Sequence, residues 1–304
     1  MNRRSVRFSN IQTSVSNTTP RDDQDQVTHG FDGRSHQMVS IHVVKFKTVK
    51  VRAQFQNEMV VAGLLKHINP SYICKTLEIS CGEEWGSIVT GKHKSTLFDF
   101  VFETKGDRRV IEPEAKRIFT KICLGVKTLH ELGIAHLDIK PENVYFDENT
   151  GVPHIFNFAS AAHVTGSKGS KSFVVDRLGV RGTHECHPPE LLNKCKCYDP
   201  FKVDVYCLGV LLHIMIAKYY PYSCKNEEVR APIFDVASEH VADSGVALLK
   251  QMLDENPFNR PTIYEILRHP WVRLGARGSS PKFLRKMKKV RTSCLKKSAS
   301  LKIW

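Results

Sequence analysis

The sequence has no long hydrophobic run and no apolar stretch at its amino terminus. No apolar segment of the 304-residue chain approaches the roughly 20 residues that cross a bilayer. The opening residues, MNRRSVRFSNIQTSVSNTTP, lack the apolar core of a secretory signal. With 41% hydrophobic and 25% charged residues, the chain can bury a large core. We therefore expect a soluble, intracellular protein, cytoplasmic or nuclear, built as one large domain or as two lobes with tails.

Paired cysteines are also missing. The nine cysteines are odd in number and scattered, and none of them stand in a C-x-x-C spacing. This distribution is typical of reduced thiols in a large cytosolic or nuclear protein. It argues against a disulfide framework.

Acidic residues are absent from residues 276–304, which carry ten Lys or Arg. Because the formal net charge of the chain is +14, the remainder is only +4, which argues against a specific nucleic-acid surface and for one local basic element. Apolar residues interleave with the basic ones at Phe283, Leu284, Met287, Val290, Leu295 and Leu301. Such a segment suits calmodulin or an anionic membrane surface, and a nuclear-import signal or a disordered basic tail explains it equally well.

Composition divides the rest of the chain into three parts. Residues 1–28 are rich in Ser, Thr, Asn, Gln and Asp, and we expect them to be disordered. From Val39 the run VSIHVVKFK predicts a strand, and residues 53–67 carry apolar side chains at helical spacing. Further strands are expected over 72–80 and 86–90, and helices over 114–132, 203–217, 246–253 and 262–272. The pattern predicts a small strand-rich part followed by a larger helical part.

The string HLDIKPEN, residues 136–143, gathers a carboxylate, a cation and an amide oxygen. Phosphoryl transfer needs a carboxylate for the acceptor hydroxyl, a cation on the phosphates and oxygen ligands for a divalent metal. The string resembles the catalytic loop HRDxKxxN of serine/threonine kinases. The resemblance implies that Asp138 is the catalytic base, that Lys140 lies near the transferred phosphate and that Asn143 is a metal ligand.

Five further strings follow the order of the eukaryotic protein kinase family. They are HIFNFA (154–159), GTHECHPPE (182–190), DVYCLG (204–209), NPFNRPT (256–262) and HPW (269–271), which resemble the DFG motif, the substrate loop GTxxYxAPE, and the DVWSLG, RPT and HPW signatures. The resemblance is to the serine/threonine type, and the run LFDFV is similar to the calcium/calmodulin-dependent group. It also implies a buried ion pair between Glu190 and Arg260.

The resemblance implies an α+β, bilobal fold with a β-rich N-lobe and a larger helical C-lobe. We place the kinase domain at residues 29–275, with the N-lobe ending near residue 91 and the C-lobe starting near 92. The disordered segment 1–28 precedes this domain and the basic tail 276–304 follows it.

In the small lobe the resemblance is looser. Lys45 ends the run HVVK and resembles the strand lysine of VAIK, while Glu58 resembles its helix partner; both would help to bind the nucleotide. Lys47 competes with Lys45, because alternate residues of a strand face the same way. A solvated helix carboxylate is the alternative for Glu58.

The hinge between the lobes is expected at residues 88–91. By the same resemblance, Val89 is the gatekeeper, and the backbone of Thr90 and Gly91 meets the adenine of ATP.

Three departures from the family pattern affect nucleotide handling or regulation. Gly30 and Gly33 do not form the phosphate-binding GxGxxG loop. Asn157 replaces the aspartate of DFG, which leaves a neutral amide oxygen as the second metal ligand. Leu137 replaces the arginine that pairs with an activation-loop phosphate, so phosphates on Ser167, Ser170 or Ser172 have no obvious partner there.

Two functions stay open on this sequence. The first is a monomeric serine/threonine protein kinase of low activity that uses ATP and Mg²⁺ on a protein substrate, which Asp138, Lys140 and Asn143 favour. The second is a pseudokinase scaffold, which Asn157 and the missing glycine loop favour. A small-molecule kinase fits less well, because the substrate loop resembles that of protein kinases.

A zinc site is disfavoured because its residues lack a C-x-x-C pair. The candidate ligands are His184, Cys186, His187, Cys195 and Cys197.

Overall fold

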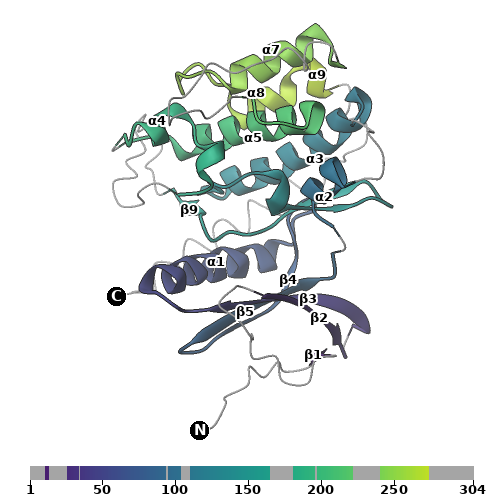
Figure 1. Cartoon of the computed structure of the whole chain (residues 1–304), viewed down its shortest axis with the longest axis vertical. Helices are drawn as coiled ribbons and strands as arrows, with labels where there is room; N and C mark the ends of the chain where they lie inside the picture. Colours follow the sequence, from purple (N-terminus) through teal and green to yellow (C-terminus); the bar gives the residue numbers. More distant parts are fainter. Residues whose placement is uncertain are drawn as a thin grey trace.

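The chain folds into two lobes in the computed structural model (Figure 1), which describes residues 11–13, 26–33, 35–93, 95–103, 110–164, 181–195, 197–221 and 240–273. The basic tail and the three activation-loop serines lie outside the described residues. A sheet with one long helix forms the smaller lobe, and helices dominate the larger lobe. The predicted α+β, bilobal architecture is confirmed.

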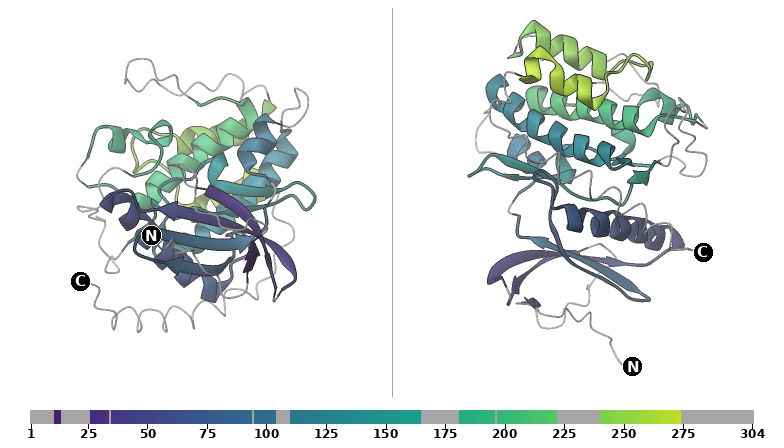
Figure 2. Two further views of the ribbon diagram at one scale, coloured as in Figure 1. Left: turned by 60° about the horizontal axis from the view of Figure 1, so that its bottom comes forward. Right: turned by 180° about the vertical axis from the view of Figure 1, so that it is seen from behind.

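An antiparallel five-stranded sheet forms the N-lobe, in the order β1-β2-β3-β5-β4. The strands are β1 (Ile11–Thr13), β2 (Gln26–Asp32), β3 (Gln37–Lys45), β4 (Thr76–Cys81) and β5 (Trp85–Gly91). Helix α1 (Val49–Ile68) lies between this sheet and the C-lobe, as the front and back views both show (Figures 1 and 2).

Strand pairing corrects part of the disorder predicted for residues 1–28. Residues 11–13 pair with β2, and β2 pairs with β3 from Gln26 onward. The prediction is wrong at these residues, because hydrogen bonds to neighbouring strands stabilise segments whose own composition is too polar to do so. The β1–β2 connection, residues 14–25, contains no glycine.

Helix α1 confirms and extends the helix predicted over 53–67. The Thr48 side chain caps it by accepting a hydrogen bond from the Val51 amide at 3.2 Å, and Asn69 ends it in the left-handed region at φ 51°. Phe55 packs against β5 at Gly86, where an added Cβ would lie only 2.2 Å from the Phe55 ring. A glycine at this point therefore lets α1 lie close to the sheet.

The C-lobe is built around helices α3 and α5. Its helices are α2 (Leu97–Phe102), α3 (Glu112–Glu131), α4 (Pro189–Leu192), α5 (Pro200–Ala217), α7 (Asp243–Met252), α8 (Ile263–Arg268) and α9 (Pro270–Arg273). Short strands complete it: β6 (Ile134–Ala135) pairs with β9 (Ala162–His163), and β7 (Val144–Asp147) pairs with β8 (Val152–Ile155). Helix α5 is long and apolar enough to span a membrane, but 89% of it is buried in the molecule, so it is a core helix here.

A buried ion pair ties α4 to the segment before α8. Arg260 Nη1 and Nη2 donate to the two carboxylate oxygens of Glu190 at 2.6 and 2.8 Å. Arg260 is 1% exposed and also donates to backbone carbonyls. The predicted Glu190–Arg260 pair is confirmed.

Candidate active site

The loop between β6 and β7 is shaped by a carboxylate of α5. Asp204, which is fully buried, accepts hydrogen bonds from the backbone amides of His136 at 2.9 Å and Leu137 at 2.7 Å. Leu137 has φ 61°, a conformation that non-glycine residues adopt only when their surroundings hold them there. The α5 carboxylate thus fixes the backbone just before Asp138.

Asp138 is oriented from two sides. Asn143 Nδ2 donates to its Oδ2 at 2.9 Å, and the hydroxyl and amide of Thr183 donate to its Oδ1 at 2.7 and 2.8 Å. Asp138 is 9% exposed. Gly182 permits this approach, since its φ is 89° and an added Cβ would lie 2.2 Å from the Leu137 carbonyl oxygen. The substrate-loop string and the catalytic-loop string therefore meet at one carboxylate.

Lys140 lies in the same loop, half-buried, at the start of the short 3-10 turn Pro141–Asn143. The three residues predicted for the catalytic loop, Asp138, Lys140 and Asn143, are thus held within one short segment. Thr183 completes the arrangement. Sequence reasoning placed it in the substrate loop but missed its contact with Asp138.

Asn157 follows β8 and has φ 63°. Its Nδ2 donates to Asn143 Oδ1 at 3.0 Å, and Asn143 Nδ2 in turn donates to Asp138. A chain of side-chain hydrogen bonds therefore runs from Asn157 through Asn143 to Asp138.

This arrangement does not fit Mg²⁺. The two predicted metal residues, Asn143 and Asn157, lie together, but Asn143 Oδ1 already accepts the Asn157 amide, and the Asn157 oxygen faces the Ala159 amide at 3.4 Å. Protein sites for Mg²⁺ rely on carboxylates, and Asp138, the carboxylate bonded to Asn143, has both oxygens engaged. In the described part of the chain, no cluster of three or more His, Cys, Asp or Glu could hold a metal ion, which also leaves the zinc alternative unsupported.

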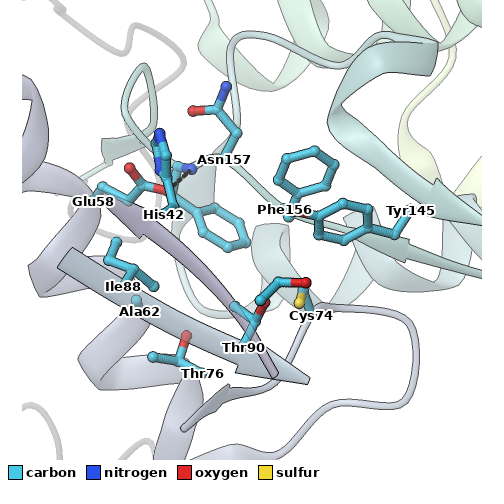
Figure 3. A pocket seen from close by; sticks show the side chains of 12 residues that line it. His42, Glu58, Ala62, Cys74, Thr76, Ile88, Thr90, Tyr145, Phe156 and Asn157 are labelled. Carbon is cyan, nitrogen blue, oxygen red and sulfur yellow. Dashed lines mark hydrogen bonds between the residues drawn. The ribbon is translucent and has the colours of Figure 1, made fainter. Parts of the chain in front are cut away.

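A cavity of about 150 Å³ lies between the lobes (Figure 3). Its lining comes from β3, α1, the start of β4, β5 and the β7–β8 region. The lining residues are Ser40, His42, Glu58, Ala62, Cys74, Thr76, Ile88, Thr90, Tyr145, Phe156, Asn157 and Phe158.

Stacked rings form the C-lobe side of this cavity. Tyr145 and Phe156 have ring centroids 3.7 Å apart at an interplanar angle of 8°, and His93 stacks on Tyr145 at 4.2 Å. Burial and the neighbouring His154 lower the pKa of His93 to about 4, while burial raises the pKa of Cys74 to about 12 and that of Tyr145 above its usual range. These groups are therefore uncharged at neutral pH.

The prediction that Lys45 binds the nucleotide is wrong in this structure. Lys45 is exposed, and its Nζ lies 5.2 Å from the centroid of the Trp85 ring. Side chains alternate along β3: Val39, Ile41 and Val43 pack into one cluster, whereas Ser40 and His42 line the cavity. Lys45 lies an even number of residues from Val39, Ile41 and Val43, so its side chain is on their face of the sheet and points away from the cavity. Lys47 is also exposed.

His42 therefore occupies the place that the family pattern gives to the strand lysine. Sequence reasoning missed it because the family motif has a lysine at this position and this chain has a histidine. The signal was present, since VSIH, residues 39–42, matches the pattern of VAIK with histidine in the last position.

The prediction that Val89 is the gatekeeper is also wrong. Val89 is 0% exposed and packs with Val39, Ile41 and Val43 on the far face of the sheet. Ile88 and Thr90 line the cavity instead, and Gly91 is not among the lining residues. Contact of the hinge backbone with adenine stays a prediction.

Glu58 faces the cavity, so the alternative of a solvated helix carboxylate is wrong. It is 7% exposed and its Oε1 accepts the Phe158 amide at 3.2 Å. The preceding residue, Asn57, donates from Nδ2 to the carbonyls of Ala161, Phe158 and Ala159 at 2.7, 3.2 and 3.3 Å. Two adjacent side chains of α1 thus bind the backbone that follows Asn157. Sequence reasoning missed Asn57, whose role depends on this long-range contact.

These features define a protein kinase domain, and comparison with known families agrees. The family model described as protein kinase domain matches residues 24–272. The chain belongs to this family.

Similar proteins come from several kingdoms. The chain is 33% identical over 222 residues to serine/threonine-protein kinase PSK2 of Saccharomyces cerevisiae, which covers 72% of the chain and 19% of that protein. It is 28% identical over 259 residues to CBL-interacting protein kinase 10 of Oryza sativa, covering 82% and 54%. It is 31% identical over 182 residues to serine/threonine-protein kinase pim-2 of Danio rerio, covering 60% and 54%. The chain thus spans about half or less of the length of these relatives.

Proposed function

We propose that the chain is a serine/threonine protein kinase with low turnover, which transfers the γ-phosphate of ATP to a protein hydroxyl. The observation that carries the proposal is the orientation of Asp138 by Asn143 and Thr183. Family membership supplies the reaction class, and two of the named relatives, PSK2 and pim-2, are serine/threonine-protein kinases.

In this proposal Asp138 positions the substrate hydroxyl and accepts its proton. The bonds from Thr183 and Asn143 hold the carboxylate in one rotamer, so the base does not have to reorganise when the substrate binds. Lys140, in the same loop, supplies positive charge to the transferred phosphate. Thr183 joins the substrate loop to the base, so the loop that would bind the acceptor is linked to Asp138 by two hydrogen bonds.

The low turnover follows from what surrounds the base. The β1–β2 connection has no glycine, His42 replaces a permanent cation, and the Asn143–Asn157 amide pair does not fit Mg²⁺. A loss of even ~3 kcal/mol of transition-state stabilisation costs about a hundredfold in rate.

The remaining assignments are proposals of the same kind. ATP is the nucleotide, a protein is the acceptor, and the chain acts as a monomer inside the cell. Residues 276–304 bind calmodulin or an anionic membrane through their basic and apolar side chains.

A pseudokinase scaffold is the second candidate. It is favoured by the amide pair and by the small cavity, whose volume of about 150 Å³ lies below the range of about 300–1,000 Å³ usual for ligand pockets. In such a protein the kinase fold would bind partners rather than transfer phosphate.

Phosphotransfer by the full chain separates the two candidates. Wild type and Asp138→Asn are incubated with γ-labelled ATP and a pool of Ser- and Thr-containing peptides, each with and without Mg²⁺. The proposal expects slow labelling by wild type that Asp138→Asn abolishes. Equal background from both proteins would support the scaffold.

A further inference from the structure

His42 is placed in the cleft by the register of β3. It lies opposite Ile88 of β5, and its side chain lines the cavity together with Glu58 of α1. Figure 3 shows His42 and Glu58 on the same side of the cavity, with Asn157 above them. The His42 imidazole therefore lines the cavity beside Glu58 and Asn157.

The charges around His42 come from few groups. Helix α1 contributes Glu58, and β5 contributes the uncharged Ile88 and Thr90. Strand β2 contributes the exposed His29, which pairs with Ser40 rather than with His42. The segment after β8 contributes the neutral Asn157. Among the described residues that line the cavity, His42 is thus the group able to carry positive charge, because Cys74 and Tyr145 become only neutral or negative.

A nucleotide triphosphate brings several negative charges into this cleft. When the His42 imidazole is neutral, the negative charge of Glu58 repels the phosphates. When the imidazole is protonated, its positive charge balances the negative charge of Glu58. A nearby anion favours the charged form of an imidazole, so bound phosphates raise its proton affinity. The ordinary pKa of histidine lies near 6.5, which puts this change within the range of cellular pH.

We infer that His42 binds the nucleotide phosphates and takes up a proton as it does so, which makes nucleotide affinity depend on pH. This inference rests on the proposed function and adds a mode of regulation to the same site. The sign follows from linkage: the bound state holds more protons than the free state, so affinity rises as pH falls. Uptake of one proton changes the affinity by at most tenfold for each pH unit.

Calorimetry on the full chain tests the inference without turnover. A non-hydrolysable ATP analogue and adenosine are titrated in EDTA between about pH 6 and about pH 8, the range in which histidine titrates. Wild type is compared with His42→Lys, His42→Gln and His29→Gln, and circular dichroism checks that each variant is folded. The analogue's own phosphate titration is common to all four proteins and cancels in the comparison.

For each protein, the measured quantity is the ratio of its affinity for the analogue at the lower pH to its affinity at the higher pH. We expect this ratio to be about tenfold larger for wild type than for His42→Gln. His42→Lys should bind more tightly than wild type at the higher pH and lose the excess pH dependence, because its charge is permanent. His29→Gln should keep the wild-type profile. Adenosine, which has no phosphate, should show no pH dependence in any variant.

Three results would overturn the inference. Identical pH profiles for wild type and His42→Gln would assign His42 a structural contact with α1 alone. Loss of the pH dependence in His29→Gln would show that the pH dependence arises from His29 and not from His42. In both cases phosphotransfer by wild type would leave the proposed kinase function intact. No analogue binding by wild type or His42→Lys at any pH would overturn the inference together with the proposed function.

Discussion

Thr183 and Asp138 show how one hydroxyl can hold a carboxylate in a single orientation. Replacing Thr183 with Val removes the 2.7 Å bond to Asp138 Oδ1 but keeps the shape of the side chain and the backbone bond. A hydrogen bond to a charged group contributes about 1.5–3 kcal/mol, so we expect kcat to fall about ten- to a hundredfold with KM little changed.

The matched control is Thr150→Val. Thr150 also donates its hydroxyl to a carboxylate, Asp147 at 2.8 Å, but on the exposed β7–β8 turn. Steady-state kinetics on both variants makes the comparison. An unchanged kcat for Thr183→Val would show that Asp138 does not depend on this bond.

At the residue scale, the sequence predicted the residues of the catalytic loop but not all of the residues that line the cavity between the lobes. Asp138 and Asn143 could be placed because their spacing lies within one short loop. Lys45 was misplaced because the lysine of the family motif was matched to HVVK, although the apolar-polar alternation from Val39 to Val43 already separates Ser40 and His42 from the other face of β3. Val89 was misplaced because β5 is buried on both faces at residues 86–89, so no alternation shows whether Ile88 or Val89 faces the cleft.

At the element scale, α1 is bound directly to the segment that follows Asn157. Asn57 and Glu58 supply the hydrogen bonds, and Arg181 Nη1 adds another to the Ala161 carbonyl at 2.9 Å. Leu137 occupies the position at which related kinases carry a phosphate-binding arginine. These contacts tie α1 to the segment that follows Asn157.

We therefore expect that activation-loop phosphorylation is not required. Alanine at Ser167, Ser170 and Ser172, which lie outside the described residues, should leave phosphotransfer within about twofold of wild type, since Leu137 offers no positive charge to a phosphate on them. By contrast, Asn57→Ala should speed hydrogen exchange of the amides of residues 158–161 and lower activity. A large loss of activity in a folded triple-alanine variant would contradict the expectation that phosphorylation of these serines is not required.

Helices were predicted better than strands. Residues 53–67 and 114–132 have the period of an amphipathic helix, and α1 and α3 cover them with ends shifted by at most a few residues. Strand β1 could not be predicted, because three residues in a polar segment carry no period of their own and gain their stability from β2.

At the scale of the whole molecule, the Glu190–Arg260 pair joins distant parts of the C-lobe. Arg260→Met leaves a buried, unpaired carboxylate, and we expect the free energy of unfolding to fall by about 3–5 kcal/mol. Chemical denaturation of Arg260→Met and of the exposed control Arg268→Met measures the difference. Adding Glu190→Gln to Arg260→Met should recover part of the loss. Equal stability of the two single variants would contradict the role of the pair.

The basic tail belongs to the same scale, because the proposed binding element lies outside the kinase domain in the sequence. A peptide of residues 276–304 should bind calcium-loaded calmodulin or vesicles of acidic lipid, and binding to the vesicles should weaken with salt. The control is a peptide in which six apolar residues are changed to Ser, which keeps the charge: Phe283, Leu284, Met287, Val290, Leu295 and Leu301. Absence of binding to both targets would leave only an import signal or an unstructured tail.

The central claim is that Asp138 is a competent base whose rate is limited because the two predicted metal residues, Asn143 and Asn157, are neutral amides. Asn157→Asp tests it most directly, because a carboxylate at this position cannot donate to Asn143 Oδ1 and supplies the charge that Mg²⁺ needs. Mg²⁺-dependent ATP affinity and peptide phosphorylation are measured for wild type, Asn157→Asp and Asn157→Asp/Asp138→Asn. We predict that the single variant binds ATP more tightly with Mg²⁺ and turns over about ten to a thousandfold faster, equivalent to ~1.4 to 4 kcal/mol, and that the double variant is inactive. A single variant that gains neither binding nor turnover would contradict the claim and identify the chain as a scaffold.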